Sequence, residues 1–206
     1  MCRPHAITSL EALEALYGKV NPNSLAKETS GLTPEYRRWI EAAPFFALAS
    51  AGPGGLDCSP RGDAESELFR ILDDRTLAFP DRRGNNRLDT LKNILADPRV
   101  ALLFLIPGID ETLRINGRAT ITTDPELIEA FAVGDKRPAT VIVVEIDAVY
   151  FQCARALARA RLWDPEARID RAAVPTAGQM TRGAAPEFDA EGYDTALPAR
   201  QKVTLY

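Results

Sequence analysis

Residues 80 to 95, PDRRGNNRLDTLKNIL, place three arginines and two asparagines around a single glycine. Leucines recur at helical spacing in the second half, so we expect a helix that begins near Asn85 or Asn86. The first backbone N–H groups of a helix have no internal partner and carry the positive end of the helix dipole, which favours an anion. Gly84 lets the backbone turn tightly and approach a ligand. The segment therefore predicts a phosphate site.

The cations of this segment are the candidate phosphate ligands. Arg87, together with Arg82 or Arg83, can place paired charge-assisted hydrogen bonds on phosphate oxygens. The alternative is an ordinary helix start whose arginines are solvated or paired with Asp81 and Asp89. Spacing alone leaves both interpretations open, because the segment matches neither GxxxxGK[ST] nor GxGxxG.

Few other residues in the chain are suited to chemistry of their own. His5 is the only histidine, and the cysteines, Cys2, Cys58 and Cys153, are odd in number and far apart. This argues against a serine–histidine triad, a disulfide framework and a metal site. We expect the cysteines to be reduced and Cys58 and Cys153 to be small core residues. The chemistry is therefore expected to come from a bound group.

The totals narrow the class of protein. A chain of 206 residues with 46% hydrophobic residues can bury a sizeable core. A net charge of −4 argues against a nucleic-acid binder, which needs a broad basic face. No apolar run approaches the length that spans a membrane, and the N-terminus has no apolar signal core. We expect a soluble, cytoplasmic protein without nucleic-acid or membrane partners.

Apolar runs between turn signals predict a mainly β domain with flanking helices. Helices are expected after the caps Ser9, Thr33 and Asp124, and the stretch NPNSLAKETSG is expected to be a linker. Pro60 within a strand indicates an unpaired edge or a bulge. The expected strands are Phe45–Ser50, Leu56–Pro60, Leu68–Leu72, Thr76–Phe79, Val100–Ile106, Thr112–Thr122 and Val141–Ile146.

About six strands in hairpin order predict a small antiparallel barrel. Val100–Ile106 and Val141–Ile146 are apolar on both faces. One small barrel can bury only one face of each strand, so the second apolar face predicts a two-fold homodimer that covers it. Thr112–Thr122 alternates and places Thr112 and Arg114 on its polar face. The predicted organisation is an N-terminal helical extension over 1–44, the barrel over 45–164, and a C-terminal tail over 165–206 with room for a short helix.

Five stretches in this order resemble the FMN-binding split barrels of the pyridoxamine-phosphate oxidase-like family, and are most similar to an uncharacterised branch of it. They are FFALAS, DCSPRGD, LAFPDRRGNNRLDTLKNIL, DPRVALLFLIPG and ETLRINGRA. The resemblance implies a six-stranded antiparallel split β-barrel that binds FMN. It also implies a homodimer in which each of two flavins lies in a groove between the subunits.

The resemblance implies a role for particular residues. Ser59, Pro60 and Arg61 would lie along the flavin ring and its ribityl chain. The phosphate would be held by Asp81, Arg82, Arg83, Asn86 and Arg87. The partner subunit would contribute Thr112 and Arg114. Trp163, with Arg159 or Arg161, would complete the pocket.

Three of these residues have plain structural alternatives. Arg61 could pair with Asp63 on a sheet edge, Arg114 could be solvated on the barrel exterior, and Trp163 could serve packing alone. The chain also departs from the oxidase pattern. It has Asn86-Arg87 where the oxidase has arginine–lysine, and it lacks the vitamin-phosphate signature near the C-terminus.

The leading hypothesis is an FMN-dependent oxidoreductase that acts on an unknown small molecule, with the flavin performing the redox chemistry. The second is a non-catalytic flavin carrier or redox sensor. The third keeps the barrel and binds a deazaflavin cofactor or haem; haem is disfavoured because His5 is the only histidine. The fourth, which needs no resemblance, is an anion-binding regulatory module. No side chain is an obvious acid or base, so the catalytic residues stay unassigned, and we expect no metal.

Overall fold

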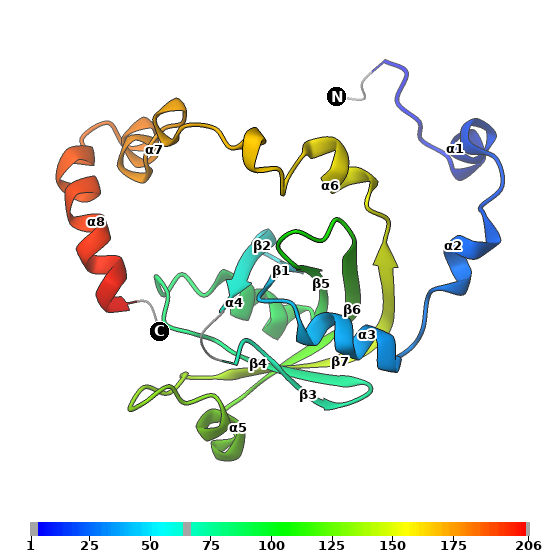
Figure 1. The fold of residues 1–206 in the computed structure, drawn as a ribbon, viewed down its shortest axis with the longest axis horizontal. Coiled ribbons are helices and arrows are strands. Elements are labelled where there is room, and N and C mark those ends of the chain that lie inside the picture. The colour runs from blue at the N-terminus through cyan, green and yellow to red at the C-terminus, as the bar shows by residue number, and fades with distance from the viewer. Residues whose placement is uncertain (1–3, 64–66, 205–206) are drawn as a thin grey trace.

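The computed structural model describes residues 4–63 and 67–204. Within that part of the chain, seven antiparallel strands form one sheet in the order β2-β1-β5-β6-β7-β4-β3 (Figure 1). The strands are β1 (Phe45–Gly52), β2 (Gly55–Gly62), β3 (Arg70–Asp73), β4 (Thr76–Pro80), β5 (Arg99–Leu105), β6 (Thr112–Thr122) and β7 (Val141–Gln152). Each expected strand corresponds to one of these seven.

The expected six-stranded barrel is corrected by this topology. The sheet has seven strands, and among the described residues β2 and β3 are its two open edges. The expected edge position of Pro60 is confirmed, since it lies in β2. The sheet nevertheless curls strongly. The rings of Phe46 in β1 and Phe79 in β4 are 5.1 Å apart between centroids, although three strands separate β1 from β4 in the order.

The curl depends on the two longest strands, β6 and β7, which run through both halves of the sheet. Their register shifts at a bulge between Asn116 and Gly117, and a bulge bends the strand that carries it. A Cβ atom at Gly117 would lie 2.2 Å from the carbonyl oxygen of Glu145. Only glycine fits this close approach of two backbones, so the sequence fixes the position of the bend.

Helices α3 (Pro34–Glu41), α4 (Asp89–Ala96) and α5 (Pro125–Ala130) flank the sheet. The expected caps Thr33 and Asp124 are confirmed, since both side chains accept backbone N–H bonds at the helix starts. Ile40 of α3 is fully buried in the core. Helix α4 packs on β1 and β2, where Asn93 Nδ2 donates to Ser50 Oγ at 3.2 Å.

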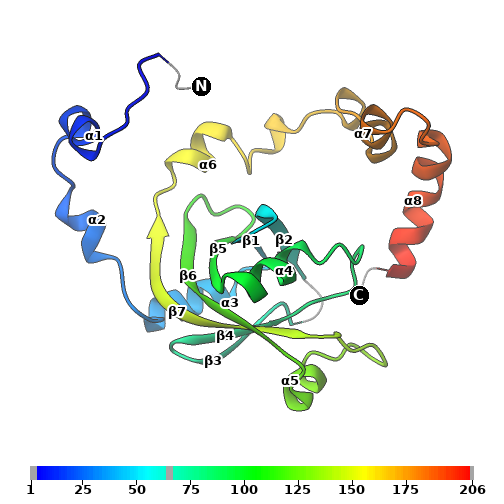
Figure 2. The same ribbon diagram turned by 180° about the vertical axis from the view of Figure 1, so that it is seen from behind.

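Two arms leave the sheet domain (Figures 1 and 2). The N-terminal arm holds α1 (Leu10–Tyr17), capped by Ser9 as expected, and α2 (Pro22–Ala26), which lies in the stretch expected to be a linker. The C-terminal arm holds α6 (Arg155–Ala160), two 3₁₀ turns, α7 (Ala177–Ala184) and α8 (Ala190–Thr204). Asp194 ties α7 to α8 by accepting bonds from Thr176 Oγ1 and the Gly178 N–H.

The prediction that Cys58 and Cys153 are small core residues is wrong. Cys58 and Cys153 are both exposed free thiols and do not belong to the core. Cys58 follows from its strand, because it alternates with the inward-facing Asp57 and Ser59 on an edge. Cys2 lies outside the described residues.

None of the described helices combines the length and apolar character needed to cross a membrane. Over residues 4–63 and 67–204, histidine, cysteine and acidic side chains nowhere gather in a group of three that could hold a metal ion.

Candidate functional site

A cavity of about 770 Å³ lies where the curled sheet stays open. One wall comes from the edge strand β2. The opposite wall comes from the end of β4, the loop 81–88 and the first turn of α4, while residues 137, 139 and 140 close a further side. Leu68 and Leu91 contribute apolar surface, and the buried rings of Phe46 and Phe79 lie behind it.

Most of the predicted site residues meet at this cavity. Ser59, Pro60 and Arg61 line it from β2. The predicted phosphate ligands line it from the opposite side: Asp81, Arg82, Arg83, Asn86 and Arg87. Thr112, Arg114 and Trp163 do not line the cavity of their own chain.

The predicted helix start is wrong by several residues. Helix α4 begins at Asp89, and the residues before it form a loop in which Asn86 and Leu88 have φ values of 59° and 61°. The Asn85 side chain accepts the Arg87 N–H at 3.0 Å, which holds this loop outside the helix. The loop therefore carries Asn86 and Arg87, and the helix N-terminus lies beyond them.

The N-terminus of α4 has no side-chain cap, because the capping position is occupied by Leu88. Thr90 and Leu91, in the first turn, line the cavity. An uncapped first turn needs acceptors for its N–H groups, which water or an anionic ligand can supply. The anion site stays a prediction, and the helix start on which it depends lies at Asp89.

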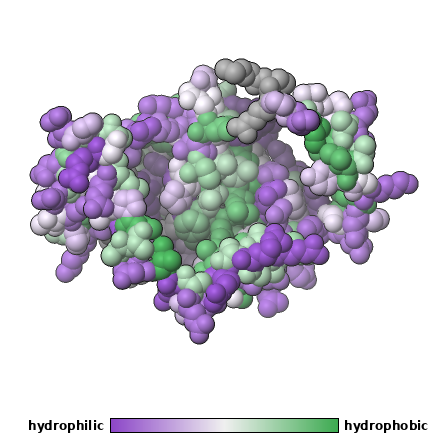
Figure 3. Space-filling model, turned by 90° about the horizontal axis from the view of Figure 1, so that it is seen from above, coloured by the Kyte–Doolittle hydropathy of each residue, from purple (hydrophilic) through white to green (hydrophobic). Residues whose placement is uncertain are grey.

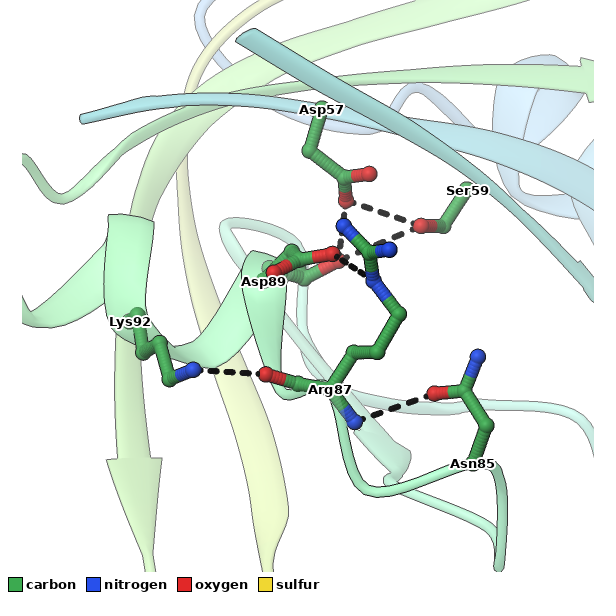
Figure 4. Close-up of polar contacts among 7 residues, drawn as sticks. Asp57, Ser59, Asn85, Arg87, Asp89 and Lys92 are labelled. Carbon is green, nitrogen blue, oxygen red and sulfur yellow. Dashed lines mark hydrogen bonds and ion pairs between the residues drawn. The ribbon is translucent and has the colours of Figure 1, made fainter. Parts of the chain in front are cut away.

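The three arginines of the loop differ in their surroundings. Arg82 anchors the loop, since NH1 donates to the Phe131 carbonyl at 2.8 Å and NH2 lies 3.7 Å from Asp63. Arg87 Nε donates to Asp89 Oδ2 at 2.7 Å (Figure 4), so the pairing of a loop arginine with Asp89, which was the structural alternative to a phosphate ligand, is present. Arg83 and Arg87 are exposed at the cavity wall, where a ligand can reach them.

Sequence reasoning missed a polar cluster beside Arg87. Asp57 Oδ2 accepts hydrogen bonds from Ser59 Oγ at 2.8 Å and from Thr90 Oγ1 at 2.5 Å (Figure 4). These bonds, above all the bond from Thr90, lower the pKa of Asp57 despite its partial burial. A signal was available, because Asp57 lies two residues before Ser59 and must share its strand face.

The other end of the cavity holds a half-buried ion pair. Arg61 NH2 lies 3.6 Å from Asp81 Oδ1 and so pairs across the cavity with Asp81, whereas the structural alternative considered from the sequence was a pair with Asp63. Burial raises the pKa of Asp81, and the nearby Arg61 opposes this rise. Within the described chain, Arg61 Nε and Thr140 Oγ1 are buried polar atoms without a hydrogen-bond partner. Both residues line the cavity.

The remaining predicted residues lie on other parts of the domain. Arg114 NH1 donates to the Tyr150 hydroxyl at 2.9 Å, on the face of the sheet turned away from the core. Trp163 Nε1 donates to the Ile109 carbonyl at 2.8 Å, which fastens the start of the C-terminal arm to the β5–β6 loop. Thr112 is buried at the start of β6.

Residues 32–153 match a family model described as pyridoxamine 5'-phosphate oxidase. The chain belongs to the pyridoxamine 5'-phosphate oxidase-like family. The matched segment runs from just before α3 to just past β7, so it contains every wall of the cavity. Helices α1, α2, α7 and α8 lie outside the segment that this family shares.

No curated protein matches the sequence significantly. Similar solved structures include HupZ of Group A Streptococcus, 18% identical with a TM-score of 0.47, over 57% of this chain and 91% of that one. General stress protein 26 of Bacillus anthracis is 16% identical with a TM-score of 0.43, over 56% and 88%. A protein related to general stress protein 26 (pyridoxinephosphate oxidase family) of Clostridium acetobutylicum is 12% identical with a TM-score of 0.44, over 57% and 85%.

Proposed function

We propose that the cavity binds FMN and that the protein is an FMN-dependent oxidoreductase acting on a small molecule. The observation that carries this proposal is a single cavity with two different ends. One end combines an uncapped helix N-terminus with Arg83, Asn86 and Arg87. The other end has an apolar floor and the guanidinium of Arg61. A phosphate joined to a flat aromatic ring system needs this combination.

The residues present fit such a group. The cavity volume lies within the range of about 300–1,000 Å³ that is usual for small-molecule sites. Buried polar atoms without partners are rare in folded proteins, because each costs free energy. Arg61 Nε and Thr140 Oγ1 are two such atoms, and both residues line the cavity. The polar edge of a flavin ring offers both acceptors and a donor for them.

Bound FMN would supply hydride and single-electron chemistry, while the protein orients the ring and sets the electrostatics around it. Arg61 provides positive charge at the ring end, which favours a ring that becomes negatively charged on reduction. Asp81, 3.6 Å from Arg61, holds this guanidinium in place. Pro60 and Leu68 give the wall an apolar surface that excludes water.

We further propose that a second copy of the chain completes the site. The face of β1 and β5 turned away from the core carries half-buried apolar side chains: Ala47, Ala49, Ala101, Leu103 and Leu105. In Figure 3, hydrophobic surface lines a hollow between more polar flanks. Arg114 and Trp163, which do not reach the cavity of their own chain, would reach the cavity of the partner, whereas Thr112 is only 4% exposed and offers little surface for such a contact.

The test is a titration of the purified protein, stripped of ligand, with FMN, followed by flavin fluorescence and the visible spectrum. We expect saturable binding, and we expect Arg87→Ala to weaken FMN binding about tenfold while riboflavin, which lacks the phosphate, is unaffected. Arg38→Ala is the matched control, since Arg38 is exposed on α3 away from the cavity. Failure of the wild-type protein to bind FMN would contradict the proposal.

The same preparation separates an enzyme from a carrier. Reduction of bound FMN by NADH or NADPH, followed by repeated turnover with an acceptor, supports the oxidoreductase. Tight binding without turnover by any nicotinamide donor favours a carrier or redox sensor, and preference for a deazaflavin over FMN identifies the third hypothesis.

A further inference from the structure

The N-terminal arm has apolar side chains that the described part of the chain leaves uncovered. Between residues 7 and 20, six large apolar side chains are 41–80% exposed: Ile7, Leu10, Leu13, Leu16, Tyr17 and Val20. Helix α1 contains no buried residue, yet isolated helices shorter than about 12 residues are marginal in water. In proteins, such a helix is stabilised mainly by packing its apolar face on another surface. The arm therefore requires a surface beyond the described residues of its own chain.

The charge of the arm indicates the nature of that surface. Residues 6–18 include Glu11 and Glu14 but no lysine, arginine or histidine. Helices that bind a lipid surface carry cations on their polar face, so this arm is unsuited to a membrane. Glu11 and Glu14 are three residues apart, and they therefore lie on one side of α1. The arm suits a protein surface that combines apolar side chains with positive charge.

Helix α6 in the C-terminal arm has this combination. Residues 153–163 include three arginines but no aspartate or glutamate. Arg161 is held by Asp164 at 2.6 Å, whereas Arg155 and Arg159 are exposed and, four residues apart, lie on one side of α6. The other positions of α6 hold Leu157 and three alanines, and small side chains allow a second helix to approach closely. The two arms thus carry one acidic and one basic helix.

The acidic and basic helices of one chain are separate from each other. In Figures 1 and 2, α1 and α6 stand apart beyond the sheet domain. In Figure 3, the C-terminal arm on the left and the N-terminal arm on the right flank the hydrophobic hollow. A molecule that fills this hollow lies beside both arms. One partner can therefore cover the apolar hollow and the apolar side chains of the N-terminal arm together.

We propose that the N-terminal arm of one copy docks on the C-terminal arm of a second copy, with α1 against the partner's α6. The inference rests on the second copy that the proposed function places over β1 and β5, and it assigns a contact that the proposed function leaves open. A second copy brings its own basic helix to the hollow. Two-fold symmetry then forms the contact twice, because each copy has one acidic and one basic helix.

Charge reversal in two separate variants tests this contact. The α1 variant is Glu11→Arg with Glu14→Arg, and the α6 variant is Arg155→Glu with Arg159→Glu. Each variant alone places like charges against each other at both contacts. We expect the dimer dissociation constant of each variant, measured by sedimentation, to rise about tenfold over that of the wild type. Neither helix contributes a buried residue, so we expect both variants to fold.

Mixing the two variants distinguishes a contact between copies from a contact within one chain. In the heterodimer, each α1 again faces an α6 of opposite charge, at both contacts. We expect the mixture to regain the wild-type dissociation constant, and native mass spectrometry of variants with different tags to show mainly heterodimer. A statistical mixture of homodimers and heterodimers overturns the inference, and so does a reversal that leaves the dissociation constant unchanged.

The matched control is Glu35→Arg with Glu126→Arg, which makes the same change of charge at exposed positions of α3 and α5. We expect this control to dimerise like the wild type. An equal loss of dimer in the control would show a general effect of net charge, which overturns the inference.

These measurements need no flavin, so they separate the inference from the proposed function. A dimer that responds to reversal and mixing as expected but does not bind FMN leaves the inference standing and contradicts the flavin proposal. A dimer that binds FMN but is insensitive to the reversals overturns the inference alone. A wild-type protein that is monomeric at every concentration also overturns the inference, whether or not it binds FMN.

Discussion

Asp57 and Asp81 are two aspartates on the walls of one cavity with opposite electrostatic surroundings. Asp57 accepts hydrogen bonds from two hydroxyl groups, which stabilise its charge and lower its pKa below the ordinary 3.8. Asp81 is more deeply buried, and the loss of hydration raises its pKa above the same value, although Arg61 lies nearby. The pKa values of the two aspartates are therefore shifted in opposite directions, because their carboxyl groups have different contacts and burial.

We predict that these two residues change stability with pH in opposite directions. Asp57 stabilises the folded state above its unfolded pKa, and this contribution is lost as the pH falls through the folded value. Asp81 has the higher pKa when folded, so its contribution declines as the pH rises above 3.8 toward the folded value. Urea unfolding of the ligand-free protein, Asp57→Asn and Asp81→Asn between pH 3 and 7 measures both effects.

The expected result is a wild-type stability relative to Asp57→Asn that increases with pH in the acid range and then stays level. Relative to Asp81→Asn, the wild-type stability should decrease with pH. Slopes of the same sign for the two variants would contradict the opposite environments of the two carboxyls.

The start of helix α4 has an unfavourable backbone conformation that lowers the stability of the helix. Leu88 occupies the capping position with φ 61° and ψ 26°, a left-handed conformation that disfavours leucine, and it supplies no capping bond. Its side chain is 45% exposed, so little packing offsets this cost. Strain of this kind is often retained next to ligand sites. Here the strained residue lies on the cavity wall.

We predict that Leu88→Asn raises the free energy of unfolding by about 1 kcal/mol, because asparagine tolerates this conformation and can cap the helix. Thermal or urea denaturation of the ligand-free protein measures the gain. Leu95→Asn is the matched control, since Leu95 is 79% exposed in the last turn of the same helix and should change stability by less than about 0.5 kcal/mol. A loss of stability in Leu88→Asn would show that packing outweighs the strain.

The sequence predicted elements well where local chemistry decides them. Thr33-Pro34 and Asp124-Pro125 mark helix starts because cap and proline act within one turn. The start of α4 was misplaced because the side chain of Asn85 and the left-handed residues after it keep the loop out of the helix. The tail was expected to have room for one short helix but holds α7 and α8, because Pro198 is unfavourable for a helix and the contact between the two helices depends on Asp194.

The order of the strands in the sheet was harder to predict from the sequence than the strands themselves. Every strand had a local signal, but the seven-stranded order and the open edges depend on pairings between distant segments. The contact of Phe46 with Phe79, which closes the curl, is of this kind. For the same reason the candidate site was predicted in part. Its arginines and Ser59 came from motifs, whereas Thr90 and Thr140 approach the cavity through the tertiary fold.

The outer face of the sheet leads to the last prediction, which concerns assembly. Leu103 of β5 faces away from the core and pairs in register with Ala47 and Arg114. In Leu103→Asp, Arg114 can form an ion pair with the new carboxylate within one subunit. A charge at the centre of an apolar subunit interface nevertheless destabilises that interface. We expect the mass measured by sedimentation to fall to 22.5 kDa, that of one chain. FMN binding should weaken with it, because the contributions proposed for the partner's Arg114 and the partner's Trp163 would be lost. Leu72→Asp, at a position 42% exposed in β3, should leave both mass and binding unchanged. A wild-type protein that is monomeric yet binds FMN would show that one chain holds the complete site.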